Sequence, residues 1–170
     1  MLGDYQAGPA ASRDPEVLNL MTEVVAKLRG DAASEIPRIL GSVFECTLQM
    51  ITLNFQDFPE HRLAFFRLLE AINRHCFAAI FVLPPLHQKL VVDSVVWAFR
   101  HHDRDIGEMG LEILQLLLSN VASAGPEIAQ PFYAAFLLPL VQDILVVMSD
   151  RLHKAHFKLH AASEFVHTVE

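Results

Sequence analysis

Apolar side chains recur every three to four residues along most of this chain, in stripes separated by short segments rich in proline, glycine and aspartate. This period is that of an amphipathic α-helix, in which 3.6 residues make one turn. No run of four or more residues alternates between apolar and polar positions in the way a half-buried strand does. The pattern predicts an all-α fold.

The first helices have recognisable boundaries. Asp14 can cap a helix that ends at Gly30, a residue able to adopt the left-handed conformation. The expected apolar stripe of that helix is Val17, Leu20, Met21, Val24 and Leu28. A second helix opens at Ser34, and Pro59 opens a third that leads toward Cys76. The most regular stripe belongs to the second helix: Ile36, Ile39, Leu40, Val43, Phe44, Thr47, Leu48 and Ile51.

Four further helices follow. Pro84 and Pro85 precede a helix over residues 86–100 that is apolar on most sides, with Asp93 and Ser94 at its one open edge. Asp105 and Glu108 form a capping-box variant for the fifth helix. The sixth, over residues 127–148, should bend near residues 135–138, because Pro139 cannot donate a backbone hydrogen bond. A seventh is expected from His153.

An aspartate before a striped helix recurs through the chain. Asp14, Asp57, Asp103 and Asp150 are spaced by 43, 46 and 47 residues, the period of a two-helix repeat. We therefore expect an α-solenoid of antiparallel helix pairs, with about three and a half repeats over residues 13–170, cut in mid-unit at both ends. Residues 1–12 are predicted to be a flexible lead-in or loop between repeats. Solenoids present extended surfaces to partners, so binding is the expected role and an enzyme is not.

Charge and composition narrow the partners. The net charge is −7, and the 13 lysines and arginines are scattered, which argues against direct nucleic-acid binding. The longest apolar runs, residues 76–86 and 132–141, are too short for a membrane span. No secretory signal is apparent in the first residues, which indicates an intracellular protein. Cys46 and Cys76 are expected to be buried free thiols.

Candidate chemistry is sparse. His153, His156 and His160 share one helical face and could bind zinc or copper, but no fourth ligand accompanies them, so no metal site is predicted. No glycine-rich phosphate loop exists, and no cofactor is expected.

Three further groups of residues have structural explanations. His101 and His102 are interpreted as helix-end residues. Asp93, Ser94 and His87 lack the spacing and the strained turn of a nucleophile set. The aromatic residues are interpreted mainly as core-packing residues and less as partner anchors: Phe44, Phe65, Phe66, Trp97, Phe132, Tyr133 and Phe136. Phe55 and Phe58, which lie near turns, are the aromatic residues best placed to be exposed.

Three long strings carry a family resemblance. EIPRILGSVFECTLQMI, FPEHRLAFFRLLEAINRHCF and LPPLHQKLVVDSVVWAFRH resemble the C-terminal part of the exportin-1 family of nuclear export receptors, within the importin-beta or karyopherin group. The similarity runs from about Asp14 to Val121 and weakens after Gly125, where Pro139 departs from the family pattern. The packing of the last hairpin is therefore left open.

The resemblance implies HEAT repeats with an armadillo-type fold and a shuttling protein of the nucleus, cytoplasm and nuclear pore. It implies Ran-GTP, leucine-rich export-signal cargo and the phenylalanine-glycine repeats of nucleoporins as partners of the full-length receptor. The signal-binding groove and its reactive cysteine would lie outside this segment, so neither Cys46 nor Cys76 corresponds to that thiol. No partner-binding residue is assigned. A HEAT-repeat scaffold of another role, such as a phosphatase regulatory subunit, is the alternative.

Overall fold

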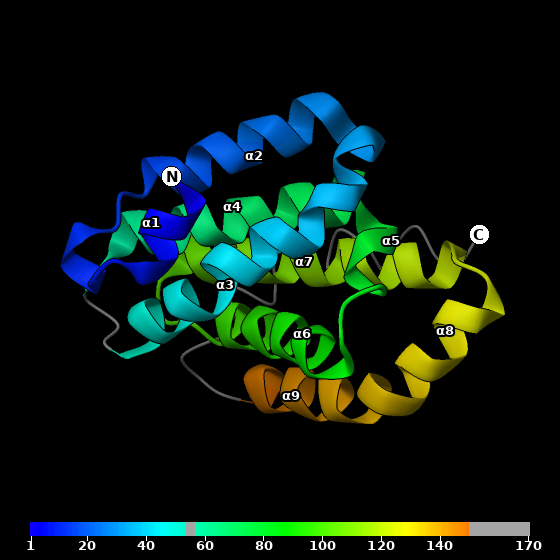
Figure 1. The fold of residues 1–170 in the computed structure, drawn as a ribbon. Helices are drawn as coiled ribbons and strands as arrows, with labels where there is room; N and C mark the ends of the chain where they lie inside the picture. The colour runs from blue at the N-terminus through cyan, green and yellow to red at the C-terminus, as the bar shows by residue number, and fades with distance from the viewer. Residues whose placement is uncertain (54–56, 150–170) are drawn as a thin grey trace. The chain divides into compact units, whose positions relative to one another are not determined.

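The computed structural model describes residues 1–53 and 57–149, and these are helical apart from short connections, with no strand among them (Figure 1). The chain divides into two compact units, Met1–Ser94 and Val95–Glu170. The described elements are α1 (Leu2–Ala7), η1 (Ala10–Ser12), α2 (Glu16–Leu28), η2 (Arg29–Glu35), α3 (Ile36–Leu53), α4 (Pro59–His75), α5 (Phe77–Ile80), α6 (Pro85–Phe99), α7 (Arg104–Ser123), α8 (Pro126–Phe132), η3 (Tyr133–Leu137) and α9 (Leu138–Ser149). The predicted all-α solenoid class is confirmed.

In the first unit, α2 and α3 run in opposite directions, and α4 packs against both of them (Figure 1). The regular stripe of α3 is buried as predicted except for Leu48, which is half-buried, and Ile36, Val43 and Ile51 have 0% exposure. Phe65 and Phe66 of α4 are 1% and 0% exposed. The core of this unit is therefore the apolar seam among α2, α3 and α4.

The buried face of α2 differs from the predicted one. Leu18, Met21 and Val25 are buried, whereas Leu20 and Leu28 are 48% and 52% exposed. Of the three buried residues, only Met21 belongs to the predicted stripe. The segment contains two neighbouring apolar arcs, and periodicity alone cannot decide between arcs that differ by one residue, or about 100° around the helix. Packing against α4 selects the arc of Leu18 and Val25.

The first 12 residues also differ from the expected loop. Leu2–Ala7 form helix α1, which packs on α3. Tyr5 is 4% exposed, and its hydroxyl lies 2.9 Å from the Thr47 hydroxyl. Arg13 anchors the segment by donating from Nε to the Tyr5 carbonyl at 3.0 Å and from Nη1 to the Cys46 carbonyl at 3.1 Å. The segment folds because of tertiary contacts that local periodicity does not show. The wider division into a lead-in and a repeat region stays a prediction.

Two predicted helix ends are wrong in their residues. The positive φ at the end of α2 belongs to Arg29, at 50°, and Gly30 has none. The cap of α7 is Asp103, whose carboxylate accepts from the Asp105 and Ile106 amides at 3.0 and 3.3 Å; Asp105 lies inside the helix. Asp103 is one of the recurring aspartates, so the repeat pattern located this cap better than the capping-box pattern.

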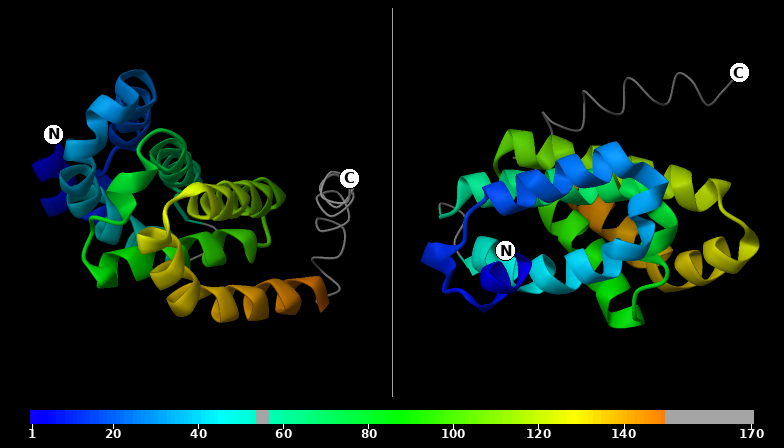
Figure 2. Two further views of the ribbon diagram at one scale, coloured as in Figure 1. Left: turned by 90° about the vertical axis from the view of Figure 1, so that its right-hand side faces the viewer. Right: turned by 45° about the horizontal axis from the view of Figure 1, so that its top comes forward.

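In the second unit, the long segment after Gly125 changes direction between α8 and α9 (Figures 1 and 2). The change falls at the π-helical turn η3, Tyr133–Leu137. Pro139 cannot donate to the carbonyl of Ala135, so the regular ladder is interrupted one turn before the proline. The predicted bend is confirmed. The predicted helix from His153 lies outside the described residues.

Candidate interaction surfaces

The α3–α4 junction contains a buried guanidinium. Arg62 is 3% exposed, and its Nη2 donates to the Asp57 carbonyl at 2.8 Å and to the Ile51 carbonyl at 3.4 Å. Ile51 lies in the last turn of α3, where carbonyls have no helical partner and a positive charge is favourable. His61, 8% exposed, donates from Nε2 to the Arg13 carbonyl at 2.9 Å. These side chains hold helix ends together and face no solvent.

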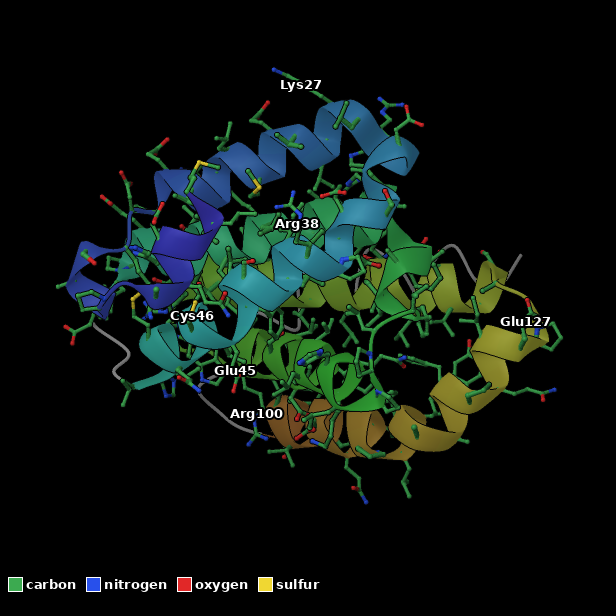
Figure 3. The ribbon with its side chains drawn as sticks, in the orientation of Figure 1. Lys27, Arg38, Glu45, Cys46, Arg100 and Glu127 are labelled. Atoms are coloured by element: carbon green, nitrogen blue, oxygen red, sulfur yellow. The ribbon has the colours of Figure 1, made fainter. Side chains whose placement is uncertain are left out.

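The two cysteines lie in different environments. Cys76 is 4% exposed and donates to the Arg29 carbonyl at 3.0 Å, so its thiol helps to hold the end of α2. Burial raises the pKa of the Cys76 thiol. Cys46 is half-buried on α3, next to the exposed Glu45 (Figure 3). Both are free thiols, as predicted, but only Cys76 is fully buried.

Thiol modification at mildly alkaline pH is expected to label Cys46 first and Cys76 at least tenfold more slowly, because the reactive species is the thiolate and burial disfavours it at Cys76. Since folding raises the pKa of Cys76, the stability that its protonated thiol contributes is present at neutral pH and is lost as the pH rises through the folded value. A Cys46→Ser variant isolates the slow thiol, and alkylation followed by mass spectrometry gives its rate. Equal rates for the two thiols in the folded chain would contradict this expectation.

The serine and histidines considered for chemistry have structural contacts. Ser94 is 1% exposed and donates to the Val91 carbonyl at 2.7 Å, which corrects its expected place at an open edge; Asp93 is exposed as expected. His101 accepts the Asp103 backbone N–H at Nδ1, 2.9 Å away, and so supports the α6–α7 turn. Among residues 1–53 and 57–149, no three histidine, cysteine or acidic residues are grouped to hold a metal ion. His153, His156 and His160 lie outside the described part of the chain.

The aromatic residues mainly contribute to packing. Phe44 and Phe65 lie 5.1 Å apart between ring centroids, and Phe65 meets Phe66 edge-on at 5.1 Å. Phe132 is buried, whereas Trp97, Tyr133 and Phe136 are half-buried. Of the two turn aromatics, Phe58 is half-buried with its ring 5.7 Å from His61, and Phe55 lies outside the described residues.

A small pocket opens between α3 and α6 within the first unit. Its interior is apolar, and its mouth carries an exposed glycine, carboxylate and imidazole. The cavity has a volume of about 70 Å³. Its lining residues are Leu40, Gly41, Phe44, Glu45, Leu83, His87 and Val91.

The second candidate surface is the face of α9. Leu138 is 68% exposed, Leu145 57% and Met148 45%, while Leu140 and Val147 are buried on another face. The segment Pro126–Ser149, of 24 residues, is long and apolar enough to cross a membrane by length and composition alone. The continuous apolar run from Phe132 to Val141 is shorter than this segment, so the expectation of no span rested on only part of it. Arg100, which directly follows α6 and is labelled in Figure 3, forms an ion pair at 2.8 Å with Asp143 of α9, and this contact ties α9 to its unit.

In the described part of the chain, paired helices with short connections and buried apolar seams define a helical-repeat fold. The chain matches the family model described as the CRM1 C-terminal region over residues 1–163. It belongs to that family, which confirms the resemblance to the C-terminal part of exportin-1.

Several relatives named Exportin-1 align with nearly the whole chain. The protein of Schizosaccharomyces pombe is 47% identical over 161 residues, which cover 95% of this chain and 15% of the relative. That of Dictyostelium discoideum is 46% identical over 159 residues, covering 94% and 15%. That of Drosophila melanogaster is 46% identical over 162 residues, covering 95% and 15%. The chain thus spans about 15% of the length of these curated relatives.

Proposed function

We propose that this chain is part of a nuclear export receptor and acts in it as a helical-repeat scaffold, and not as an enzyme. The observation that carries the proposal is the 47% identity to Exportin-1 of Schizosaccharomyces pombe over 95% of the chain. The all-α architecture of packed helices supports it. The receptor would shuttle between nucleus and cytoplasm.

The partners of the whole receptor follow from the family resemblance. They would be Ran in its GTP form, cargo with leucine-rich export signals, and the phenylalanine-glycine repeats of nucleoporins. The signal-binding groove would lie in repeats outside this segment. The raised pKa and burial of Cys76 suit a structural thiol better than a reactive one, in keeping with that placement.

In a repeat scaffold each unit contacts only its neighbours, so small changes at successive interfaces add up to a change in superhelical pitch. Through such strain, binding of the GTPase could be coupled to binding of cargo. Apolar seams like that of α2, α3 and α4 are the surfaces at which these changes would occur. If the angles between these repeats were the same in the free and the Ran-bound receptor, the proposed coupling through this segment would be contradicted.

A segment exchange tests the proposed function. In Schizosaccharomyces pombe, the 161 matched residues of Exportin-1 are replaced by this chain, and the location of a fluorescent reporter with a leucine-rich export signal is followed. We expect the reporter to remain cytoplasmic, because the segment supplies the same scaffold.

Two controls make the exchange decisive. A chimera carrying Phe66→Asp, which places a charge at a side chain with 0% exposure, should lose export. The isolated chain should bind a leucine-rich signal peptide far more weakly than the functional chimera does. Nuclear accumulation of the reporter with a folded, normally abundant chimera would contradict the export role, and signal-peptide binding by the chain alone at the affinity of the chimera would contradict the scaffold role.

A further inference from the structure

Two helical glycines in this chain have different surroundings. A Cβ added at Gly110 would meet the backbone of Ala98 and Phe99, so the close crossing of α6 and α7 requires a glycine there. A Cβ added at Gly41, in the interior of α3, would meet nothing within 4 Å. Glycine in a helix interior is less favourable than alanine. Among residues 1–53 and 57–149, no packing contact accounts for a glycine at position 41.

The missing side chain at Gly41 leaves the mouth of the α3–α6 pocket open. Behind it, Leu40, Phe44, Leu83 and Val91 are 4%, 5%, 6% and 4% exposed and form an apolar interior. The Gly41 carbonyl accepts from the Gln6 side-chain amide at 3.3 Å, so the backbone at the mouth is anchored to α1. Buried apolar side chains thus form the pocket, and a glycine in α3 keeps its mouth open at some cost to the stability of that helix.

Two exposed apolar side chains stand next to pocket-lining residues in the sequence. Val82 is 76% exposed and Leu86 67%, and they adjoin the lining residues Leu83 and His87 in sequence. Exposed apolar side chains grouped beside a recess are typical of a protein-binding surface. A small molecule confined to 70 Å³ would leave Val82 and Leu86 uncovered, whereas a polypeptide can cover both.

We propose that the α3–α6 pocket is a docking site for a partner polypeptide that inserts one leucine-sized aliphatic side chain and places a basic residue beside Glu45. The volume selects an aliphatic side chain. An engineered apolar cavity of about 150 Å³ holds a benzene ring, and this pocket, at about 70 Å³, has less than half of that volume. An aromatic ring would therefore require the walls to move.

Charge selects the flanking residue. Glu45 is exposed at the pocket mouth, and its Oε1 accepts a hydrogen bond from the neutral Gln49 amide at 3.4 Å. The next acidic residue toward the start of α3, Glu35, is already paired with Arg38 at 2.6 Å. A lysine or arginine next to the anchor would pair with Glu45, and an acidic residue would be repelled. Exposed ion pairs contribute little binding free energy, so the contact with Glu45 mainly orients the partner. Most of the affinity comes from the aliphatic side chain inserted in the pocket.

Photo-crosslinking of the full 170-residue chain tests this assignment. The probe is the nine-residue peptide Gly-Ser-Gly-Lys-X-Lys-Gly-Ser-Gly, in which X is photo-leucine, and crosslinked residues are located by mass spectrometry. We expect crosslinks at residues 40–45 and 83–91. An unlabelled competitor with leucine at X should be roughly tenfold more effective than one with alanine. Replacing both lysines by glutamate should lower the yield roughly threefold.

Matched variants at Gly41 separate docking from folding. Gly41→Leu places a side chain in the mouth and should lower the crosslink yield roughly tenfold, whereas Gly41→Ala should retain most of it; both should keep the helicity and raise the melting temperature. In Glu45→Gln, the lysine and glutamate peptides should crosslink equally. Crosslinks scattered over the chain, or a yield unaffected by Gly41→Leu, would overturn the proposal. A crosslinked pair of chains through this pocket would assign it to a second copy and would also overturn it.

Discussion

Replacing Arg62 by methionine is expected to lower the free energy of unfolding by about 2–5 kcal/mol. Methionine is flexible and apolar and fills much of the arginine's space. It cannot donate to the carbonyls of Ile51 and Asp57, which lie 3.4 and 2.8 Å from Nη2 of Arg62. A buried acceptor left without a donor costs about 1–3 kcal/mol. Urea unfolding followed by circular dichroism measures the change.

Two effects compete at this position. Removing a buried charge relieves the cost of its desolvation, and buried ion pairs have been replaced by apolar side chains without loss of stability when both partners are replaced. Here the acceptors are main-chain carbonyls, which no substitution removes, so the loss of their donor should outweigh the relief. Arg62→Lys keeps the charge but not the fork of donors, and its effect should be intermediate.

Arg67 provides the matched control for Arg62. It lies on the same helix α4 but is exposed, and Arg67→Met should change stability by no more than about 0.5 kcal/mol. Equal effects at the two positions would show that the carbonyl contacts of Arg62 do not stabilise the α3–α4 junction.

Arg62 also shows how far the sequence could predict this fold. Positions 62, 65, 66 and 69 recur at helical spacing, and all four are buried. From the sequence, the apolar stripe of α4 is visible from Phe65 onward, and arginine at position 62 would be expected to be exposed. The helical spacing of position 62 relative to the apolar stripe was the sequence signal that could have indicated a buried arginine. Helix-start prolines and the stripe of α3, by contrast, were sufficient to predict their elements, because local chemistry alone decides them.

Other features depend on contacts distant in sequence. Tyr5 is buried through Thr47, 42 residues away, so no local pattern predicts helix α1 as part of the core. The pocket needs Gly41 from α3 and Leu83 and Val91 from around α6, and it forms only once those helices pack. No pattern in the sequence marks a partner-binding residue. The family resemblance identified the class of protein but not this surface, since a cavity depends on how side chains from separate helices fit together.

Gly110→Ala is expected to destabilise the second unit by about 1–3 kcal/mol or more, although alanine is the better helix former. The added Cβ would lie 2.7 Å from the Ala98 carbonyl carbon and 2.8 Å from the Ala98 Cβ, and it would also contact the Phe99 backbone nitrogen. Main-chain atoms cannot rotate away as a flexible side chain can. The helices α6 and α7 would have to separate, and the buried contacts of Ile106, Ile113 and Phe99 would loosen with them.

Gly41→Ala is the matched control, because the same chemical change is made in a helix where the new Cβ meets no atom within 4 Å. It should stabilise the chain by about 0.5–1 kcal/mol, so the two substitutions should differ in sign. Thermal unfolding of both variants and the parent chain measures the contrast. If Gly110→Ala stabilised the chain as Gly41→Ala does, α6 and α7 would not cross at the distance described. Opposite signs would show that the close crossing of α6 and α7 requires glycine at position 110, whereas the packing around position 41 tolerates a side chain.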